Sequence, residues 1–368
     1  MHRRHFLKTT AATTATGAAA AAASFPAPAI AQGRQELKLV TTWPKNFPGL
    51  GTSAQRLADR ITAMTDGRIT VKLFGAGEIV PAFEAFDAVA SETADMYHGA
   101  EYYWQGKSKA FSFFAAVPFG LTASEMNAWL YHGGGQELWD ELAADFGIKP
   151  FAACNTGVQM GGWFRKPVTS LEDLKGLSFR MPGLGGEALR KLDVAVTNLP
   201  GGDVFPALQS GAIDGTEWVG PWNDLAFGFY KVTKHYHWPG IHEPGTTLSM
   251  GMNLKKWQSL SKTDQDIIAN ACAAENNVGN AEFNARNGGA LETLRREHGV
   301  QLHRFDDKIL QRLGEASGEV LAEVASEGGL VKRVYDSFID FREKSLAWMR
   351  YADQGYMNAR TLPFTYRK

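Results

Sequence analysis

The stretch "ELKLVTTWP" (36–44), followed by "TSAQRLADRITAMTDGR" (52–68) and "ITVKLFG" (69–75), decides the fold. The first segment is a short apolar run of strand length. The second carries apolar residues such as Leu57 and Ile61 at helical spacing, and a glycine follows it. The third is again a strand-like run. Strand, helix and strand in this order predict parallel βα units, and therefore an α/β fold.

The same alternation continues along the chain. A further helix is expected over 80–96. After residue 150 the predicted strands are 150–155, 177–181, 195–200 and 212–218, with short helices between them. The run "TLSMGMN" (247–253) then predicts a return to the first unit, and 263–299 predicts one very long helix or two in series. We therefore expect one lobe from 32–153 plus 244–306, a second lobe from 154–243, and amphipathic helices over 307–368 that pack on the core or form a dimer.

Residues 1–31 are typical of an export signal. Paired arginines (Arg3, Arg4) precede an Ala/Thr-rich apolar stretch and a small-residue A-x-A cleavage site, so the mature chain is expected from about Gln32. The twin arginines resemble a twin-arginine signal, which usually exports folded proteins. The alternative is an N-terminal membrane anchor, but the alanine run is weakly apolar for a bilayer core. We expect a periplasmic protein.

Charge and hydropathy exclude two classes of partner. The whole chain has 38 basic and 39 acidic residues, a formal net charge of −1, and loss of three basic residues with the export signal leaves −4. This mildly acidic chain has no basic tract, so no nucleic-acid binding is expected. No later stretch approaches about 18 uninterrupted apolar residues, so the mature protein is expected to be soluble.

The cysteine content offers no framework for a redox or zinc site. Only Cys154 and Cys272 occur, and no CxxC motif is present. In an oxidising compartment the two can pair. Cys154 ends an apolar strand-like run, whereas Cys272 lies in a helical pattern, so two buried free thiols are favoured while pairing stays open.

One motif suggests a dinucleotide-dependent enzyme. The segment "GLGGEA" (183–188) matches G-x-G-x-x-A after a strand, and Asp203 lies about 20 residues further on. However, the preceding strand contains Arg180, the motif lies deep in the chain, and Asp203 follows Pro200, past the strand end where a ribose-binding acid belongs. A twin-arginine-exported oxidoreductase is therefore the alternative hypothesis and not the preferred one.

Two other enzyme-like motifs are incomplete. "YHGGGQ" (131–136) resembles an esterase oxyanion loop, but no G-x-S-x-G nucleophile motif accompanies it. "HYH" (235–237) places two imidazoles on one strand face, but no third ligand follows at metal-site spacing, which favours a surface pair. We expect no catalytic site.

Polar residues at the ends of three predicted strands are expected to converge. Arg180 ends one strand, and its guanidinium can hold a carboxylate through two parallel hydrogen bonds. Asn155 and Gln159 follow a second strand in "NTGVQMGGW", and Glu217-Trp218 ends a third. A solvent-facing edge arginine and a polar turn are the structural alternatives. Two α/β lobes with such a cleft are typical of a hinged binding protein.

The segments "NTGVQMGGWFR", "LKGLSFRMPG", "GGDVFPALQSGAIDGTEWVGP" and "YYWQGKSKAFSFFAAVPFG" together resemble the substrate-binding proteins of TRAP transporters (DctP-type family). Nearly the whole mature chain is covered, and the branch most similar binds 2-oxo acids and lactate. The resemblance implies a class II-like fold of two lobes, with an interlobe cleft, crossing strands and a long connecting helix. It also implies capture of an organic carboxylate and its delivery to a membrane permease that uses a sodium gradient.

The resemblance also implies roles for individual residues. Arg180 corresponds to the carboxylate clamp, and a Na⁺ or Ca²⁺ ion is held by Gln159, the Glu217 carboxylate and the Trp218 backbone carbonyl. All three are oxygen ligands, as a hard cation requires. The further expected ligand contacts are Asn155, Trp218, Glu243 and Tyr102, with Tyr103 an alternative to Tyr102.

The resulting prediction is a non-enzymatic periplasmic receptor. It is expected to bind a small monocarboxylate, a 2-oxo acid such as pyruvate first and lactate second, together with one metal cation. The residues do not decide which acid or which cation. Relatives in this branch suggest a homodimer through the C-terminal helices, which periodicity alone does not establish.

Overall fold

The computed structural model describes residues 34–366, and the predicted export segment (1–31) lies outside the described residues. The strands of the described range are β1 (Gln35–Thr41), β2 (Ile69–Phe74), β3 (Met96–Gly99), β4 (Ile148–Asn155), β5 (Gly162–Phe164), β6 (Ser178–Arg180), β7 (Ala195–Thr197), β8 (Gly215–Thr216), β9 (His235–Trp238), β10 (Thr247–Asn253) and β11 (Gln301–Arg304). The helices are α2 (Gly51–Met64), α3 (Ala85–Ala90), α4 (Ala123–His132), α5 (Gly135–Ala144), α6 (Gly183–Arg190), α7 (Gly201–Ser210), α8 (Pro221–Phe227), α9 (Leu254–Ser259), α10 (Lys262–Arg296), α11 (Asp307–Ala325), α12 (Gly329–Met349) and α13 (Asp353–Arg360).

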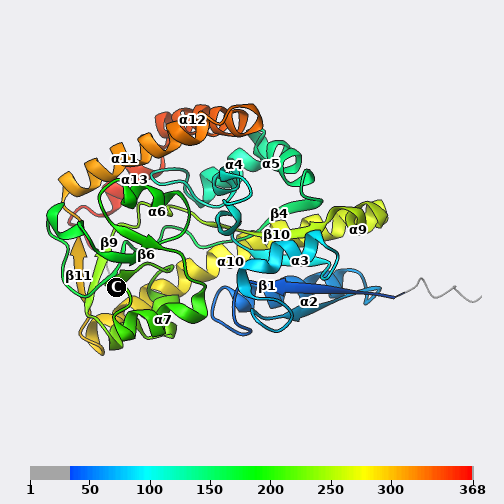
Figure 1. Cartoon of the computed structure of the whole chain (residues 1–368), viewed down its shortest axis with the longest axis horizontal. Coiled ribbons are helices and arrows are strands. Elements are labelled where there is room, and N and C mark those ends of the chain that lie inside the picture. The colour runs from blue at the N-terminus through cyan, green and yellow to red at the C-terminus, as the bar shows by residue number, and fades with distance from the viewer. Residues whose placement is uncertain (1–33, 367–368) are drawn as a thin grey trace, which may run out of the picture.

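The strands form two separate mixed sheets (Figure 1). The five-stranded sheet has the order β2-β1-β3-β10-β4, with β1 parallel to both β2 and β3. β10 runs antiparallel to β3 and β4, so the chain returns to this sheet at 247–253 as its apolar pattern predicts. The α/β class and the parallel βα units predicted from the opening stretch are confirmed.

The six-stranded sheet has the order β11-β9-β5-β8-β6-β7. β6 is parallel to β7 and β8, whereas β5 is antiparallel to β8 and β9. The predicted strand 212–218 is wrong in length, because only Gly215–Thr216 pair in the ladder. Glu217 and Trp218 lie beyond β8 and before α8, so they stand at the edge of the sheet where the chain turns.

One limit of the predicted lobes differs from the sheet assignment. β11 lies inside 244–306, which the sequence assigns to the first lobe, yet it pairs in parallel with β9 in the six-stranded sheet. The physical reason is that α10 carries the chain across the molecule before β11 begins. This pairing favours an end of the first-lobe segment before residue 301, and the limits of the lobes stay a prediction.

Helix α10 connects the two halves of the molecule as one continuous helix of 35 residues. It packs against α2 and β4 on one side and against α8 of the other half, and Figure 1 shows it running between them. A Cβ atom on Gly279 would lie 2.3 Å from Cys154 Sγ, so only glycine lets the helix approach β4 this closely. Cys154 and Cys272 are both buried and free, so they do not pair.

The aromatic core beside the five-stranded sheet is closed by the C-terminal helices. Phe114 stacks between Trp129 of α4 and Trp139 of α5, at ring-centroid distances of 5.4 and 5.2 Å. Phe338 of α12 packs edge-on against Trp129. In the described part of the chain, no helix combines the length and the apolarity that a membrane span requires.

Candidate functional site

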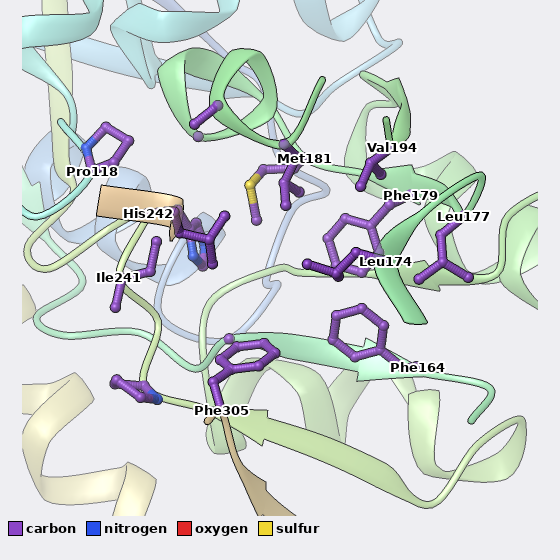
Figure 2. Close-up of a pocket in the computed structure, with 16 residues that line it drawn as sticks. Pro118, Phe164, Leu174, Leu177, Phe179, Met181, Val194, Ile241, His242 and Phe305 are labelled. Atoms are coloured by element: carbon purple, nitrogen blue, oxygen red, sulfur yellow. The ribbon is translucent and has the colours of Figure 1, made fainter. Parts of the chain in front are cut away.

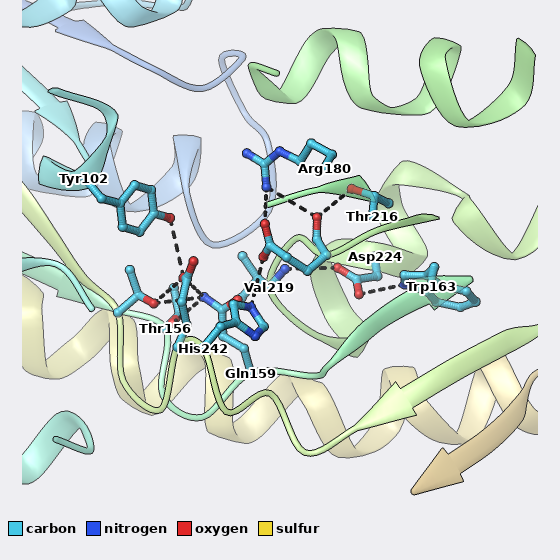
Figure 3. A network of polar contacts seen from close by, with 12 residues as sticks. Tyr102, Thr156, Gln159, Trp163, Arg180, Thr216, Val219, Asp224 and His242 are labelled. Atoms are coloured by element: carbon cyan, nitrogen blue, oxygen red, sulfur yellow. Dashed lines mark hydrogen bonds and ion pairs between the residues drawn. The ribbon is translucent and has the colours of Figure 1, made fainter. Parts of the chain in front are cut away.

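Arg180 belongs to a buried network of polar side chains (Figure 3). It is the last residue of β6 and is only 1% exposed. Its Nε donates to the Leu199 carbonyl at 3.1 Å, its Nη1 forms an ion pair with the Glu217 carboxylate, and its Cζ lies 4.9 Å from the Trp218 ring centroid. Within residues 34–366 its Nη2 has no hydrogen-bond partner. The guanidinium thus retains donor capacity that points to an anionic ligand.

Glu217 lies between Arg180 and a second basic group. One carboxylate oxygen faces Arg180, and the other, Oε2, is 3.2 Å from His242 Nε2. Burial lowers the pKa of His242, but the hydrogen bond and the charge of Glu217 outweigh burial and leave that pKa raised. All three side chains are fully enclosed by protein. A buried carboxylate is tolerated here because it is paired on both sides.

Gln159 holds a second buried acid in place. Its Nε2 is 2.7 Å from Glu243 Oε2 and 3.1 Å from both Thr156 Oγ1 and Thr246 Oγ1. Burial, followed by the nearby charge of Glu217, raises the pKa of Glu243 to about 7. Gln159 Oε1 is buried and accepts no hydrogen bond from any described residue. An oxygen acceptor is therefore left free beside two carboxyl groups.

These groups fit a hard metal cation. Ligand atoms of Glu217, His242 and Glu243 lie within 4.8 Å of one another. Carboxylate and amide oxygens are the ligands that Na⁺ and Ca²⁺ take. A bound cation would also satisfy Gln159 Oε1, a buried amide oxygen that accepts no hydrogen bond from the described residues. Gln159, Glu217 and Trp218 thus lie in one place, with Glu243 and His242 beside them, and their role as cation ligands stays a prediction.

The cavity at this site is small and its walls are aromatic. It has a volume of about 10 Å³, and its walls include Arg180, Gln159 and Trp218. Both tyrosines that the sequence could not separate line it, and Tyr102 Oη also lies 3.4 Å from Glu243 Oε2. Such walls exclude water, which strengthens charge interactions inside.

Asn155 is placed differently from the other predicted contacts. Its side chain does not line this cavity. Its Nδ2 donates to the Gly245 carbonyl and to Thr247 Oγ1, both at 3.3 Å, and its Oδ1 accepts from the Gly157 N–H at 2.9 Å. These bonds join the end of β4 to the segment that leads into β10. A ligand contact by Asn155 stays a prediction.

Asp224 of α8 binds the backbone next to Glu217 and Trp218, in the segment that follows β8. Its Oδ1 accepts from the Val219 N–H at 3.3 Å, and its Oδ2 accepts from Trp163 Nε1 at 2.9 Å and Tyr236 Oη at 2.6 Å. The carboxyl is buried, and burial raises its pKa to about 7. It fixes the backbone that carries two of the candidate ligands (Figure 3).

The raised pKa of Asp224 predicts a pH-dependent stability. The folded state keeps a proton that the unfolded chain releases from its usual pKa near 4, so the stability this group contributes is complete below that pH and is lost as pH rises through about 7. In Asp224→Asn this dependence should disappear. We expect the unfolding free energy of the wild type to fall relative to the variant between pH 5 and pH 8, by about 1–3 kcal/mol. Urea unfolding at both pH values measures it, and a constant difference would contradict the titration.

A second enclosed cavity lies nearby and is chemically unsuitable for an acid. It has a volume of about 30 Å³ and apolar walls that include Phe164, Phe179, Met181 and Phe305 (Figure 2). His242 is the only ionisable residue in its lining. A carboxylate there would lose its hydration without gaining partners, so we assign no carboxylate site to this cavity.

Four further residues of the site could not be predicted from the sequence, because the roles of their side chains depend on tertiary contacts. These residues are Thr156, Asp224, His242 and Thr246. His242 directly precedes the predicted Glu243. This neighbouring position is the one feature of the sequence that could have indicated a role for His242. Asp224 looks like an ordinary surface acid in the first turn of a helix, and only its burial reveals its role.

Comparison with known proteins finds one family and a relative of similar length. Residues 39–327 match the family "bacterial extracellular solute-binding protein, family 7" (DctP). The chain is 39% identical over 360 residues to a monocarboxylate 2-oxoacid-binding periplasmic protein of Nostoc sp., covering 97% of this chain and 98% of that protein.

Two solved structures are similar in both fold and sequence. A TRAP periplasmic solute-binding protein of Pseudoalteromonas atlantica, with bound sodium and pyruvate, has a TM-score of 0.86 and 38% identity, over 90% of this chain and 100% of that one. A TRAP transporter solute-binding protein of Bordetella bronchiseptica has a TM-score of 0.87 and 34% identity, over 89% and 97%. The latter is a dimer of mixed occupancy with calcium and picolinate in one site.

Proposed function

Since this chain belongs to the DctP family of TRAP solute-binding proteins, we propose that it captures a small 2-oxo monocarboxylate together with one Na⁺ or Ca²⁺ ion. Pyruvate is the first candidate, because the Pseudoalteromonas relative contains it with sodium. Lactate is the second, since a 2-hydroxyl can replace the 2-oxo oxygen as a cation ligand.

One observation carries the proposal: the Arg180–Glu217 ion pair lies beside the unpartnered Gln159 Oε1. A carboxylate ligand that pairs with Arg180 leaves the Glu217 carboxylate buried without its main partner. A buried charge without a partner destabilises the complex. A cation held by Glu217, Gln159 and the Trp218 carbonyl would compensate that charge. The cation supplies a positive charge to which the acid and its 2-oxo oxygen can bind. Arg180, Glu217, Gln159 and Trp218 therefore work as one set.

The charges of the site favour a monocarboxylate over a dicarboxylate. The guanidinium of Arg180 can pair with one carboxylate, whereas the acids Glu217 and Glu243 would repel a second one. Tyr102, Tyr103 and Trp218 provide apolar surface for a short alkyl group. Asn155 does not line the cavity, and its contact with the ligand stays a prediction.

A thermal-shift screen tests this function. Pyruvate, 2-oxobutyrate, lactate and succinate would be compared in a buffer that contains no sodium of its own. Each acid is tested after addition of Na⁺, of Ca²⁺ or of a chelator. At a hundredfold excess over Kd a ligand stabilises by about 2.7 kcal/mol, which for a protein of this size is a shift of a few degrees. We expect 2-oxo acids to shift the melting temperature most, and only with a cation. The absence of a shift with every monocarboxylate would refute the proposal.

The family consists of solute-binding receptors, so the chain is not an enzyme. The alternative, a dinucleotide oxidoreductase using "GLGGEA", finds no support in the comparisons. That segment forms α6, whose Gly185 and Gly186 pack closely against Met181 and His242. Close helix–strand packing thus accounts for the glycines without a cofactor.

The working cycle that we propose takes place in the periplasm. The relatives are periplasmic proteins, and the sequence of 1–31 favours export by the twin-arginine route. N-terminal sequencing of the exported protein tests the predicted cleavage before Gln32. The two lobes, joined by the crossing segments and α10, would close on the ligand and then deliver it to the membrane permease of a TRAP transporter.

We also propose that the receptor is a homodimer through its C-terminal helices. Only Val334 and Phe338 of α12 are buried, whereas Trp348 and Tyr351 are 67% and 78% exposed. Large exposed apolar groups of this kind mark interaction surfaces, and the Bordetella relative is a dimer.

Light scattering on a sizing column measures this association. We expect the wild type to have twice the mass of the chain, and Trp348→Glu with Tyr351→Glu to have the mass of one chain. Tyr131→Glu, at an exposed apolar residue on α4, is the control and should stay dimeric. A monomeric wild type at micromolar concentration would exclude the dimer.

A further inference from the structure

Three histidines lie together on the six-stranded sheet, apart from the carboxylate site. In the parallel pair of β9 and β11, His237 is opposite His303 and His235 is opposite Gln301. Because side chains of alternate residues share one face of a strand, His235, His237 and His303 project from the same side of the sheet. The sequence pattern predicts only the first two as a surface pair. β11 supplies the third imidazole from a position 66 residues beyond His237 in the chain.

Two of these rings have nitrogen atoms about as close together as two nitrogen ligands of one metal ion. His235 Nδ1 and His303 Nε2 are 3.0 Å apart, and their ring centroids are 5.1 Å apart with an interplanar angle of 53°. At this distance the N–H of one ring donates a hydrogen bond to the lone pair of the other, so a proton lies between the two nitrogens. A tetrahedral metal with Zn–N bonds of about 2.0–2.1 Å holds its nitrogens about 3.3–3.4 Å apart. An ion would therefore replace the shared proton, with the two rings turned toward a common point and their nitrogens a few tenths of an ångström further apart.

His237 positions this pair from the protein side. The Val168 N–H donates to His237 Nε2 at 3.0 Å, which places the ring proton on Nδ1. The His237 ring stacks on His303 with a centroid distance of 4.9 Å and an interplanar angle of 24°. The hydrogen bond and the stacking therefore hold the three rings close together.

We infer that His235 Nδ1 and His303 Nε2 form a second metal site, for a borderline divalent ion such as Zn²⁺, Ni²⁺ or Cu²⁺. Nitrogen ligands select these ions over Na⁺ and Ca²⁺, which prefer oxygen, so this site differs in chemistry from the carboxylate site. Among residues 34–366 no group of three acidic, histidine or cysteine ligand atoms gathers here, so water completes the coordination. Both histidines are partly exposed, which gives the ion a path from solvent.

The location gives such an ion a structural effect. β11 is an edge strand of only four residues between the end of α10 and the start of α11. A metal shared by His235 and His303 would join this edge strand to β9 by a bond between side chains, in addition to the backbone ladder. Since binding to the folded state alone stabilises it, the ion should raise the melting temperature.

Calorimetric titration of Zn²⁺ and Ni²⁺ into untagged, chelator-treated mature protein tests the inference. The variants are His303→Asn and His235→Asn, and the matched control is His132→Asn, an exposed histidine on α4. We expect one binding event in the wild type and the control, weakened about tenfold or more in both site variants. Circular dichroism checks that each variant is folded.

The carboxylate site also contains a histidine, so its contribution must be separated. Zinc bound by Glu217, His242 and Glu243 would be unaffected by His303→Asn and would compete with Ca²⁺ and pyruvate. The titrations are therefore run with Ca²⁺ and pyruvate present to block the carboxylate site. Binding that then survives in both site variants, or no binding by the wild type, would overturn the inference. This outcome leaves the receptor function untouched, because pyruvate binding is measured separately without transition metals.

Discussion

Arg180→Met should abolish pyruvate binding while the protein remains folded. The guanidinium is buried, its Nη2 has no partner among the described residues, and it is the group best placed to pair with the ligand carboxylate. Loss of one partner of a buried, hydrogen-bonded charge pair costs about 2–5 kcal/mol, or roughly 30- to 5,000-fold in Kd. Calorimetry with pyruvate in the presence of Ca²⁺ measures the loss, and tryptophan fluorescence provides a second readout because Trp218 lies against Arg180.

A double variant separates binding from stability. Arg180→Met alone leaves Glu217 buried with only His242 as a partner, so the melting temperature should fall. Arg180→Met/Glu217→Gln removes both charges and should regain much of that stability without regaining binding. Arg180→Lys keeps the charge but loses the paired hydrogen bonds, and intermediate affinity is expected. Near-normal affinity in folded Arg180→Met would show that another group holds the carboxylate.

Strand ends account for the part of the site that the sequence could predict. Arg180 and Glu217 end strand-like runs and Gln159 follows one a few residues later, and runs of that kind end at a sheet edge. The structure brings these three together although they come from separate segments: Arg180 ends β6, Glu217 follows β8, and Gln159 lies between β4 and β5. The pattern did not reveal that Arg180 and Glu217 contact each other directly, since it locates strand ends but not side-chain partners.

The residues that escaped prediction depend on pairings between distant segments. β11 follows a 35-residue helix, and nothing in its own four residues indicates that it pairs with β9 in the second sheet. The same pairing decides the position of His303, so the histidine cluster could not be read from "HYH" alone. The shortness of β8 has a related cause, because its neighbours in the sheet are themselves only three residues long. Length of an apolar run therefore overestimates a strand whose partners end early.

Glu217→Gln should uncouple the cation from the ligand. In the wild type the cation and the carboxylate ligand should bind together. When the ligand pairs with Arg180, Glu217 loses its partner and its charge is then balanced by the cation. We expect Ca²⁺ to tighten pyruvate binding by a factor in the typical range for linked sites, about 5- to 150-fold, and pyruvate to tighten Ca²⁺ binding by the same factor. In Glu217→Gln this factor should fall close to one, because a neutral amide cannot compensate the charge of the ion.

Titrations of pyruvate in sodium-free buffer, with chelator and with saturating Ca²⁺, measure the coupling in each variant. Glu101→Gln is the matched control: Glu101 is equally buried and accepts a 2.7 Å hydrogen bond from Tyr97 Oη, but it does not line the cavity. That variant should keep the full coupling even if its stability changes. Cation dependence that persists in Glu217→Gln would move the ion to other ligands, with Glu243 and Gln159 the nearest. The outcome therefore shows whether the acid at the end of β8 holds the cation or only neutralises Arg180.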